Sequence, residues 1–513
     1  MHWTQEIIPI GRLDQLLFPF YEADFREGRL TRDDAQEILD CFWIKLDEKV
    51  VRNRRYMEDH FTSSDGALTG VPGSSNFDQG ALLNQWMQQI TIGGVIADDE
   101  PEPKDASNAV TLLCIESARR LPLNSPTLDL RVHKGTPRHV LDAAAKALLS
   151  GGAHPVILSD DRIVPGLAGS PVLQQEDGNR MALRDARDYA CDGCFETMPA
   201  GRTEFSFGYV SALDSLEKAL NRGAGFANAG PQNLRGWKAS YRTNAPADID
   251  SFEDLWAILT THIEVGCHRY LSGLIGTYGV KADYCPSPLL SAFIDGCVES
   301  GRDFTAGGAR YHLFSPLMTG ISTAADSLWV IKHCVFDEQR FTLDELVQCL
   351  KTNWGNETEY VGASIAPDRV AEIYALVKQQ KKFGQGHAEV DELAWRLIQT
   401  FTDAVRRARL HPVHRAGFEA LKAKYDTPEW PFEIILAPGV GTFEQYLFGG
   451  GFIGATPDGR RSRNGIASDL SPAPVHRDDS PWIEGSSPVQ HARQVPLADG
   501  LRSYANDVMN LLP

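Results

Sequence analysis

Residues 128–137, LDLRVHKGTP, carry the pattern that decides the fold class. Apolar and polar side chains alternate over LDLRVH, and this period of two predicts a half-buried β-strand at residues 128–133. Thr136 and Pro137 follow, and they predict the N-cap and the first position of a helix. The stretch therefore predicts a strand that leads directly into a helix.

The residues that follow complete a βαβ unit. Gly151 and Gly152 predict the end of the helix, and the apolar run at residues 155–158 (PVIL) predicts the next strand. Two strands joined through one helix pair in parallel, because the helix returns the chain to the same end of the sheet. The sequence therefore predicts an α/β fold.

Further helices along the chain support the same class. Thr31 with Asp34, and Thr342 with Glu345, predict helix starts closed by a capping box. Residues 391–406 predict one long helix. Pattern alone does not distinguish an open sheet from a closed barrel.

Composition indicates an acidic soluble protein. The 513 residues are 42% hydrophobic and 23% charged, with a net charge of -18, which disfavours binding to nucleic acid or to an anionic membrane surface. The sequence shows no internal repeat, no apolar run of membrane-spanning length and no signal-peptide pattern. Nine cysteines, an odd number scattered along the chain, do not suggest a disulfide framework. We expect a cytoplasmic protein.

Residues 188–196, DYACDGCFE, are the strongest candidate for chemistry. Cys194 lies two residues before Glu196, so in an extended chain the two side chains point to the same side. A thiol can then abstract a hydrogen atom from a substrate while the carboxyl group moves a proton. Gly193 allows another backbone to approach the thiol closely.

Other interpretations of these cysteines stay open from the residues alone. Cys191 and Cys194 have the spacing of a redox dithiol or of half a zinc site. The sequence offers no second C-x-x-C and no paired histidines, so we predict no metal site. Both thiols could instead be buried as small hydrophobic groups.

Five segments, in the same order, resemble glycyl radical enzymes of the pyruvate formate-lyase-like family. Gly193-Cys194-Phe195-Glu196 resembles the Gly-Cys-x-Glu loop of its dehydratases and decarboxylases. The other four are residues 11–15 (GRLDQ), 92–108 with 128–137, 308–311 (GARY) with 325–328 (ADSL), and 454–460 (GATPDGR) with 469–472 (DLSP). The resemblance runs from Gly11 to Pro472.

This resemblance implies a ten-stranded α/β barrel, made of two antiparallel halves of parallel strands and surrounded by helices. In that family one loop inside the barrel carries the cysteine, and a second carries a glycine that is held as a radical. The glycyl radical takes a hydrogen atom from the cysteine, and the resulting thiyl takes one from the substrate. Such chemistry needs a site that excludes water.

The resemblance also assigns roles to residues. Cys194 is expected to be the thiyl residue and Glu196 the general acid or base. Arg310 and His312 could face a polar substrate or make structural hydrogen bonds. The aromatic stretch 205–209 (FSFGY) could line the pocket, although core packing is the preferred interpretation.

The chain departs from the family in ways that bear on its organisation. The radical motif Arg-Val-x-Gly-Tyr and the family's N-terminal helical region are not found, and Gly449-Gly450-Gly451 predicts a tight turn. We expect residues 1–475 to form a partial barrel domain. Residues 476–513 are expected to be a loop or linker that leads toward a missing glycine radical domain.

The predicted function is that of a glycyl radical lyase working anaerobically. Cys194 is followed by Phe195 rather than a second cysteine, which disfavours the formate acetyltransferase reaction on pyruvate, and Glu196 favours dehydration or decarboxylation. The chain would then cleave a C–C or C–O bond of a small organic substrate. The alternatives are a non-catalytic scaffold that retains the barrel, or a thiol oxidoreductase using Cys191 and Cys194.

The same resemblance gives the expected partners. A radical SAM activating enzyme with a 4Fe–4S cluster would install the radical, on a glycine that another subunit could supply. No cofactor is expected to bind this chain directly. We also expect a homo-oligomer.

Overall fold

The computed structural model of the chain describes residues 9–47, 89–123, 126–151, 154–169, 181–192, 195–226, 240–357, 363–428, 431–441, 445–462 and 464–467. Cys194 and the predicted linker at 476–513 lie outside these residues, so those predictions stay untested.

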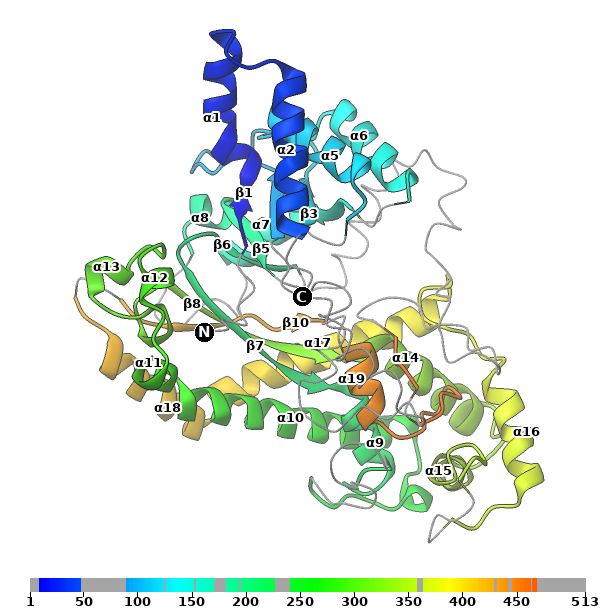
Figure 1. Cartoon of the computed structure of the whole chain (residues 1–513). Helices are drawn as coiled ribbons and strands as arrows, with labels where there is room; N and C mark the ends of the chain where they lie inside the picture. The colour runs from blue at the N-terminus through cyan, green and yellow to red at the C-terminus, as the bar shows by residue number, and fades with distance from the viewer. Residues whose placement is uncertain are drawn as a thin grey trace, which may run out of the picture.

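The first half of the chain is a parallel sheet covered by helices on one face (Figure 1). The sheet has the order β1-β2-β3-β4, and every neighbouring pair is parallel. Its strands are β1 (Gly11–Arg12), β2 (Gln89–Gly93), β3 (Thr127–Val132) and β4 (Val156–Ser159), and its helices are α1 (Leu13–Arg26), α2 (Arg32–Asp47), α5 (Ala109–Arg120) and α6 (Arg138–Leu149). The predicted βαβ unit is confirmed as β3-α6-β4.

Two details of that unit differ from the prediction. Strand β3 is buried along its whole length, not half-buried, because α5 and α6 cover one face and later parts of the chain cover the other. Thr136 does not cap α6: its hydroxyl accepts from the backbone N–H of His133 (2.8 Å), and Pro137 occupies the N-cap position. The polar residues of β3 therefore point into the interior of the molecule.

A helical link and a β-hairpin follow the first sheet. They are α7 (Asp160–Gly169), α8 (Leu183–Arg187), β5 (Tyr189–Asp192) and β6 (Glu196–Pro199). β5 and β6 are antiparallel and pair Asp192 with Glu196. We call this element, residues 189–199, the cysteine hairpin, because Cys194 lies in its three-residue connection.

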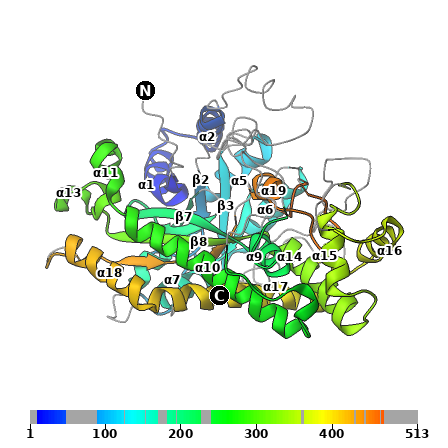
Figure 2. The same cartoon turned by 90° about the horizontal axis from the view of Figure 1, so that it is seen from below.

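The second half is another parallel sheet, in which β8 pairs with β7 on one edge and with β9 and then β10 on the other. Its strands are β7 (Thr203–Ser211), β8 (Tyr311–Thr319), β9 (Ile434–Leu436) and β10 (Gly439–Val440). Figure 2 shows α10 running along this sheet, and α17 packs against α10 on the same side. The core between them is the largest apolar cluster among the described residues.

The helices of the second half include two that the sequence predicts, α15 and α17. The helices described in this half are α9 (Ala212–Leu220), α10 (Phe252–Thr277), α11 (Val280–Tyr284), α12 (Pro288–Ser291), α13 (Cys297–Ser300), α14 (Ile321–Val330), α15 (Leu343–Lys351), α16 (Pro367–Val377), α17 (Ala388–Leu410), α18 (Pro412–Tyr425) and α19 (Gln445–Phe452). The capping box of α15 is confirmed, and so is the long helix α17. The tight turn predicted at Gly449–Gly451 is wrong, because these residues lie within α19. A Cβ on Gly450 would meet the backbone oxygen of Asn464 at 2.5 Å, so this glycine serves a close packing of two segments.

The cysteine hairpin joins the inner faces of the two sheets. On the first sheet, the N–H of Cys191 donates to the hydroxyl of Thr91 (3.0 Å). On the second, Met198 packs in an apolar group with Leu313 of β8 and Ile435 of β9. The hydroxyl of Tyr311 also donates to Asp185, just before the hairpin (2.6 Å). The described part of the chain thus forms two parallel half-sheets with the hairpin between them, and hydrogen bonds between strands do not close these sheets into a ring.

Candidate active site

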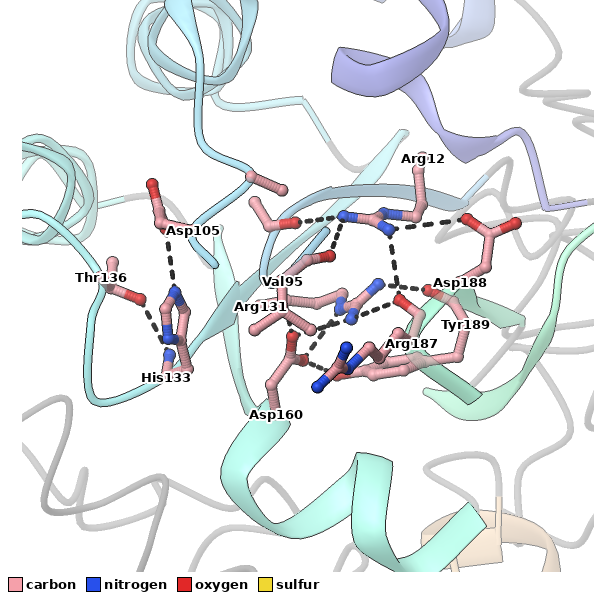
Figure 3. Close-up of polar contacts among 12 residues, drawn as sticks. Arg12, Val95, Asp105, Arg131, His133, Thr136, Asp160, Arg187, Asp188 and Tyr189 are labelled. Atoms are coloured by element: carbon pink, nitrogen blue, oxygen red, sulfur yellow. Dashed lines mark hydrogen bonds and ion pairs between the residues drawn. The ribbon is translucent and has the colours of Figure 1, made fainter. Parts of the chain in front are cut away.

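A buried arginine on β3 fixes the start of the cysteine hairpin (Figure 3). Arg131 is fully buried and donates twice to the carboxylate of Asp160, over 2.8 and 2.7 Å. Its remaining donors reach the backbone oxygens of Tyr189 (2.8 Å) and Arg187 (2.9 Å). Its guanidinium also lies 3.8 Å from the centre of the Tyr189 ring. One side chain therefore fixes both the backbone and the first ring of β5.

The ion pair of Arg131 and Asp160 determines the charge state of this cluster. Burial is the largest single influence and works against the charge of Arg131, but the charge and hydrogen bonds of Asp160, together with Tyr189 and Cys191, outweigh it and hold the pKa of Arg131 above its usual range. The hydroxyl of Tyr189 donates to the same carboxylate (2.7 Å), and burial together with that negative charge raises the pKa of Tyr189. Arg131 is therefore charged and the phenol of Tyr189 neutral at physiological pH.

A second buried arginine reinforces the same backbone. Arg12, the last residue of β1, donates to the backbone oxygens of Gly93, Val95 and Arg187 over 2.8 to 3.2 Å. Burial and the nearby charge of Arg131 lower the pKa of Arg12 to about 10, so its guanidinium stays charged near neutral pH. The oxygen of Arg187 thus accepts from both arginines.

The thiol of Cys191 is buried on the hairpin face that covers the first sheet. Burial raises its pKa well above the usual range, and the nearby carboxyl groups of Asp129 and Glu196 act in the same direction. The positive charge of Arg131 lowers the pKa of Cys191, but its effect is smaller than that of burial. Cys191 is therefore a neutral thiol, which is a poor nucleophile and a poor metal ligand.

The connection of the hairpin contains a residue in an unusual conformation. Phe195 has a φ of 78°, in the left-handed region that side chains rarely adopt. The chain turns at this point, so the extended conformation that the sequence analysis assumed between Cys194 and Glu196 is wrong at Phe195. Strain of this kind persists only where the surroundings enforce it, and it gathers at functional sites.

The residues expected to bind substrate lie apart from the cysteine hairpin. Arg310 is exposed, and its guanidinium lies 3.9 Å from the carboxylate of Asp295. His312 is buried on the helix-covered face of β8, where its Nδ1 lies 2.6 Å from the carboxylate of Glu204 and its ring 4.6 Å from that of Phe432. Side chains alternate along a strand, and neighbouring Leu313 faces the hairpin. A substrate role for Arg310 and His312 stays a prediction, and their surroundings favour a structural one.

The aromatic stretch of β7 is not part of the core. The rings of Phe205, Phe207 and Tyr209 follow one another along one face of the strand, with centres 6.1 and 5.6 Å apart. Phe207 and Tyr209 are each 37% exposed. The core packing preferred from sequence is therefore wrong for these two rings.

Among the described residues we find neither a metal-binding group nor a membrane-spanning helix. They contain no group of three or more His, Cys, Asp or Glu side chains arranged to hold a metal ion. None of their helices combines the length and the apolar character that a membrane crossing requires.

Comparisons with known proteins agree with this architecture. Residues 3–418 match the family model described as pyruvate formate lyase-like. The chain belongs to this family. Its similarity to (2S)-3-sulfopropanediol dehydratase of Klebsiella oxytoca is 28% identity over 75% of this chain and 41% of that protein. Its similarity to trans-4-hydroxy-L-proline dehydratase of Clostridioides difficile is 29% identity over 67% of this chain and 39% of that protein.

Solved structures extend the likeness to the fold. The glycerol-bound form of the B12-independent glycerol dehydratase from Clostridium butyricum superposes with a TM-score of 0.68, at 26% identity, over 92% of this chain and 50% of that one. A glycyl radical enzyme from Archaeoglobus fulgidus, at 23% identity, shares the fold with a TM-score of 0.71 over 99% of this chain and 58% of that one. The predicted α/β fold of glycyl radical enzyme type is confirmed. The chain spans about half the length of these proteins or less.

The sequence analysis missed the residues that hold the hairpin. Arg131 and Asp160 stand 29 positions apart, and the bonds of Arg131 reach a further 29 to Tyr189. The signal was a charged residue in the middle of a strand, because burial of such a group requires a partner. Which partner that is depends on the three-dimensional fold.

Proposed function

We propose that this chain is the catalytic core of a glycyl radical lyase that cleaves a C–O or C–C bond of a small organic substrate. The observation that carries the proposal is the enclosure of the cysteine hairpin between the inner faces of two parallel half-sheets. One face holds it by buried hydrogen bonds from Arg131 to the backbone oxygens of Tyr189 and of Arg187 just before it, and the other by apolar packing. Atom transfer requires a rigid, water-excluding site of this kind.

In the proposed reaction, Cys194 carries the unpaired electron to the substrate. Its thiyl sulfur takes a hydrogen atom from a substrate carbon, which leaves a thiol and a carbon radical. Glu196 moves the proton that accompanies loss of the leaving group. The product radical then takes a hydrogen atom back from the thiol of Cys194, so electrons and atoms balance over one turnover.

The position of Glu196 fits its proposed role. Covalent geometry keeps the Cα atoms of Cys194 and Glu196 within about 7.6 Å of each other, because consecutive Cα atoms are 3.8 Å apart. Glu196 also lies close enough to Cys191 for its charge to act on that thiol. A substrate in contact with Cys194 is therefore within reach of the Glu196 carboxyl group.

The radical would come from a glycine in an Arg-Val-x-Gly-Tyr motif, on a segment or polypeptide that joins this chain, after action of a radical SAM activating enzyme. Relatives at 25% identity or more include dehydratases and sulfite-lyases. This supports bond cleavage beside an activated carbon. We keep the cytoplasm as the proposed location.

The alternative function, that of a thiol oxidoreductase, is less well supported. A dithiol enzyme needs one cysteine with a lowered pKa, and burial raises the pKa of Cys191. Peptide mapping with and without reductant tests the point. A reversible disulfide between Cys191 and Cys194 would favour the redox function.

The deciding experiment is anaerobic co-expression of the chain with a glycine-bearing polypeptide and an activating enzyme. We expect a glycyl doublet in the EPR spectrum and turnover of a substrate from a panel of small hydroxylated and sulfonated compounds. Cys194→Ala should keep the doublet and abolish turnover. Glu196→Gln should keep the doublet and lower kcat by about 10²–10⁴-fold.

Cys285→Ala is the matched control, because Cys285 is an exposed thiol outside the hairpin. It should leave both signals unchanged. Turnover that survives Cys194→Ala, or a doublet without turnover of any panel compound, would favour the alternative function of a non-catalytic scaffold.

A further inference from the structure

Three histidine rings meet where α18 packs against α10 and α17 (Figure 1). His268 lies on α10, His411 is the single residue between α17 and α18, and His414 lies in the first turn of α18. The ring centre of His268 is 5.1 Å from that of His411 and 5.0 Å from that of His414, and the other two centres are 5.9 Å apart. We call these three residues the histidine joint. Imidazole is the side chain that ordinarily gains its charge between pH 5 and 8, so the joint gathers three such groups in mutual contact.

The hydrogen bonds of the joint suit neutral rings. Nδ1 of His414 lies 2.8 Å from the backbone oxygen of Ala408, which only accepts, so this nitrogen carries a proton. The Nε2 atom of the same ring lies 3.1 Å from the hydroxyl of Ser272 on α10 and accepts from it when the ring is neutral. Nδ1 of His411 accepts from the backbone N–H of Val413 at 3.4 Å. Protonation of His411 at both nitrogens removes that acceptor.

The charged groups around the joint do not compensate three positive rings. Glu264 lies one turn before His268 and is the carboxylate that acts on it, but Arg407 of α17 already pairs with Glu264 over 2.8 Å. Burial raises the pKa of the neighbouring Cys267 to about 12, so this thiol is neutral. The other arginines next to the joint in sequence also have carboxylate partners: Arg409 pairs with Glu433, and Arg415 with Glu419.

The packed joint therefore resists protonation. Burial lowers the pKa of His268, the charges of His414 and His411 lower it further, and Glu264 opposes them. The carbonyl end of α17 favours one positive charge at this position, but several charges at these distances repel one another. The closed joint then binds fewer protons than an opened one. Its stabilising effect is present above the ordinary pKa of histidine and is lost as the pH falls below it.

Helix α18 has few other buried contacts. Of its 14 residues, only His414, Leu421 and Tyr425 are buried. Gly417 lies directly against α10, because a Cβ at this position would come within 2.7 Å of the side chain of Ile275. A segment with so few buried side chains opens locally at a low cost in free energy. One of the three that hold α18 is a titratable ring of the joint.

The far end of α18 braces the second sheet. Tyr425 packs against Tyr278 and Phe432, with ring centres 5.3 and 5.1 Å apart. The hydroxyl of Tyr278 donates to Glu204, near the start of β7 (2.8 Å). Release of α18 therefore removes a contact that supports the start of this strand.

We propose that the histidine joint is an acid-sensitive switch, in which protonation below about pH 6 loosens α18 from α10 and withdraws Tyr425 from the start of β7. The switch is built from residues outside the cysteine hairpin and requires no radical, so it stands or falls apart from the proposed function. The competing explanation is that the three rings serve only to fill the corner between the helices. In that case the protection of α18 does not depend on the charge of the rings.

Hydrogen–deuterium exchange of the 513-residue chain at pH 7.5 and 5.0, followed by mass spectrometry, tests the switch. After correction for intrinsic exchange rates, the opening constant of α18 should rise by about tenfold or more at the lower pH. The reason is that each proton taken up on opening changes this constant by up to about tenfold per pH unit. Peptides from α5, which contains no histidine, are the internal reference and should change by less than about twofold.

Variants assign the effect to the joint. His411 is exposed, so His411→Gln leaves the fold intact and should reduce the effect of pH on α18 by about threefold or more. The double variant His268→Gln with His411→Gln should remove most of it. His139→Gln is the matched control, because His139 is an exposed histidine on α6 in the first half, and it should keep the full effect.

Two outcomes would overturn the inference. One is a wild-type α18 whose opening changes between the two pH values no more than that of α5. The other is a full pH effect in folded His411→Gln and in the folded double variant. If the double variant does not fold, the single variant His411→Gln decides alone.

Discussion

The two half-sheets hold the same hairpin by different forces. The first sheet presents polar side chains to the hairpin. Arg131 and Arg12 hold it there through charged hydrogen bonds to backbone oxygens in and just before the hairpin. The second presents apolar side chains, and Leu313 and Ile435 pack against Met198. Apolar packing is not directional, whereas a planar guanidinium with fixed donors sets the position of each acceptor. The first sheet therefore sets where the hairpin lies, and the second mainly keeps water away from it.

The two halves also differ in what surrounds a buried carboxyl group. Asp326 in the second half accepts a hydrogen bond from the N–H of Phe383 (2.6 Å) and lies 3.9 Å from the ammonium group of Lys382. Asp129 in the first half has the polar side chains of Gln89, Cys191 and Thr91 as neighbours, and no cation acts on its pKa. Burial raises the pKa of both carboxyl groups, but of the two only Asp326 faces a cation that offsets part of the rise. Several variants test these differences between the two halves.

The largest effect is expected from Arg131→Met. The variant leaves the Asp160 carboxylate buried without its main cation, and breaking a buried pair in this way costs about 3–5 kcal/mol. Urea unfolding followed by circular dichroism measures the loss. Arg138→Met is the control, since Arg138 pairs with Asp142 on the exposed surface, and its effect should stay below about 1 kcal/mol. An equal effect of the two variants would contradict the role given to the first sheet.

The second-largest effect is a dependence of the unfolding free energy on pH, caused by Asp326. Burial raises its pKa to about 7, and the charge of Lys382 opposes the rise while Asp458 and Asp391 add to it. The folded state then binds a proton that the unfolded state has already released above pH 4. Stability from this group is present at low pH and is lost as the pH rises toward 7, by about 2–3 kcal/mol between pH 5 and 7.5.

Asp326→Asn should remove that dependence while keeping the bond from Phe383. The difference in unfolding free energy between variant and wild type, measured by urea at pH 5 and 7.5, should shift in favour of the variant as the pH rises. A difference that stays constant across this range would contradict a raised pKa of Asp326 in the folded state.

The third effect concerns the connection of the hairpin. A left-handed backbone conformation costs a non-glycine residue about 1–2 kcal/mol of conformational free energy. Phe195 has this conformation in the folded state. Phe195→Gly relieves this strain but also removes the ring, which packs against the buried group around Cys191, so its net effect on stability should stay within about 1 kcal/mol. In the activated complex the same variant should lower kcat, because a looser connection holds Cys194 less firmly. Thermal unfolding and turnover, measured together, test both statements.

The sequence predicted the local features of both halves and missed what depends on contacts between them. The strand at 128–133 and its helix follow from periodicity, and capping boxes follow from residue types three positions apart. The burial of Asp129 and Arg131 does not follow, because the hairpin that covers them stands about 60 residues further on. Alternation of apolar and polar residues cannot separate a solvent-facing strand face from a polar interior.

The candidate site shows the same limit. Glu196 and the cysteine motif could be named from a resemblance, since the motif is continuous in sequence. The left-handed Phe195 could not, because it is imposed by the pairing of Asp192 with Glu196 across a short connection. His312 was named for its residue type, and only the alternation along β8 shows that it faces the helices.

The smallest effect compares the helix caps of the two halves. Thr31 accepts from the N–H of Asp34 before α2, and Thr342 accepts from the N–H of Glu345 before α15, each at 3.1 Å. Either threonine changed to alanine should cost about 0.5–1 kcal/mol, because one backbone N–H loses its acceptor. If the halves unfold in one cooperative transition, both variants should lower the same urea midpoint by similar amounts. If the charged inner face of the first sheet makes that half a separate unit, Thr31→Ala should shift only one of two transitions, seen by hydrogen exchange of β3 and β8 amides.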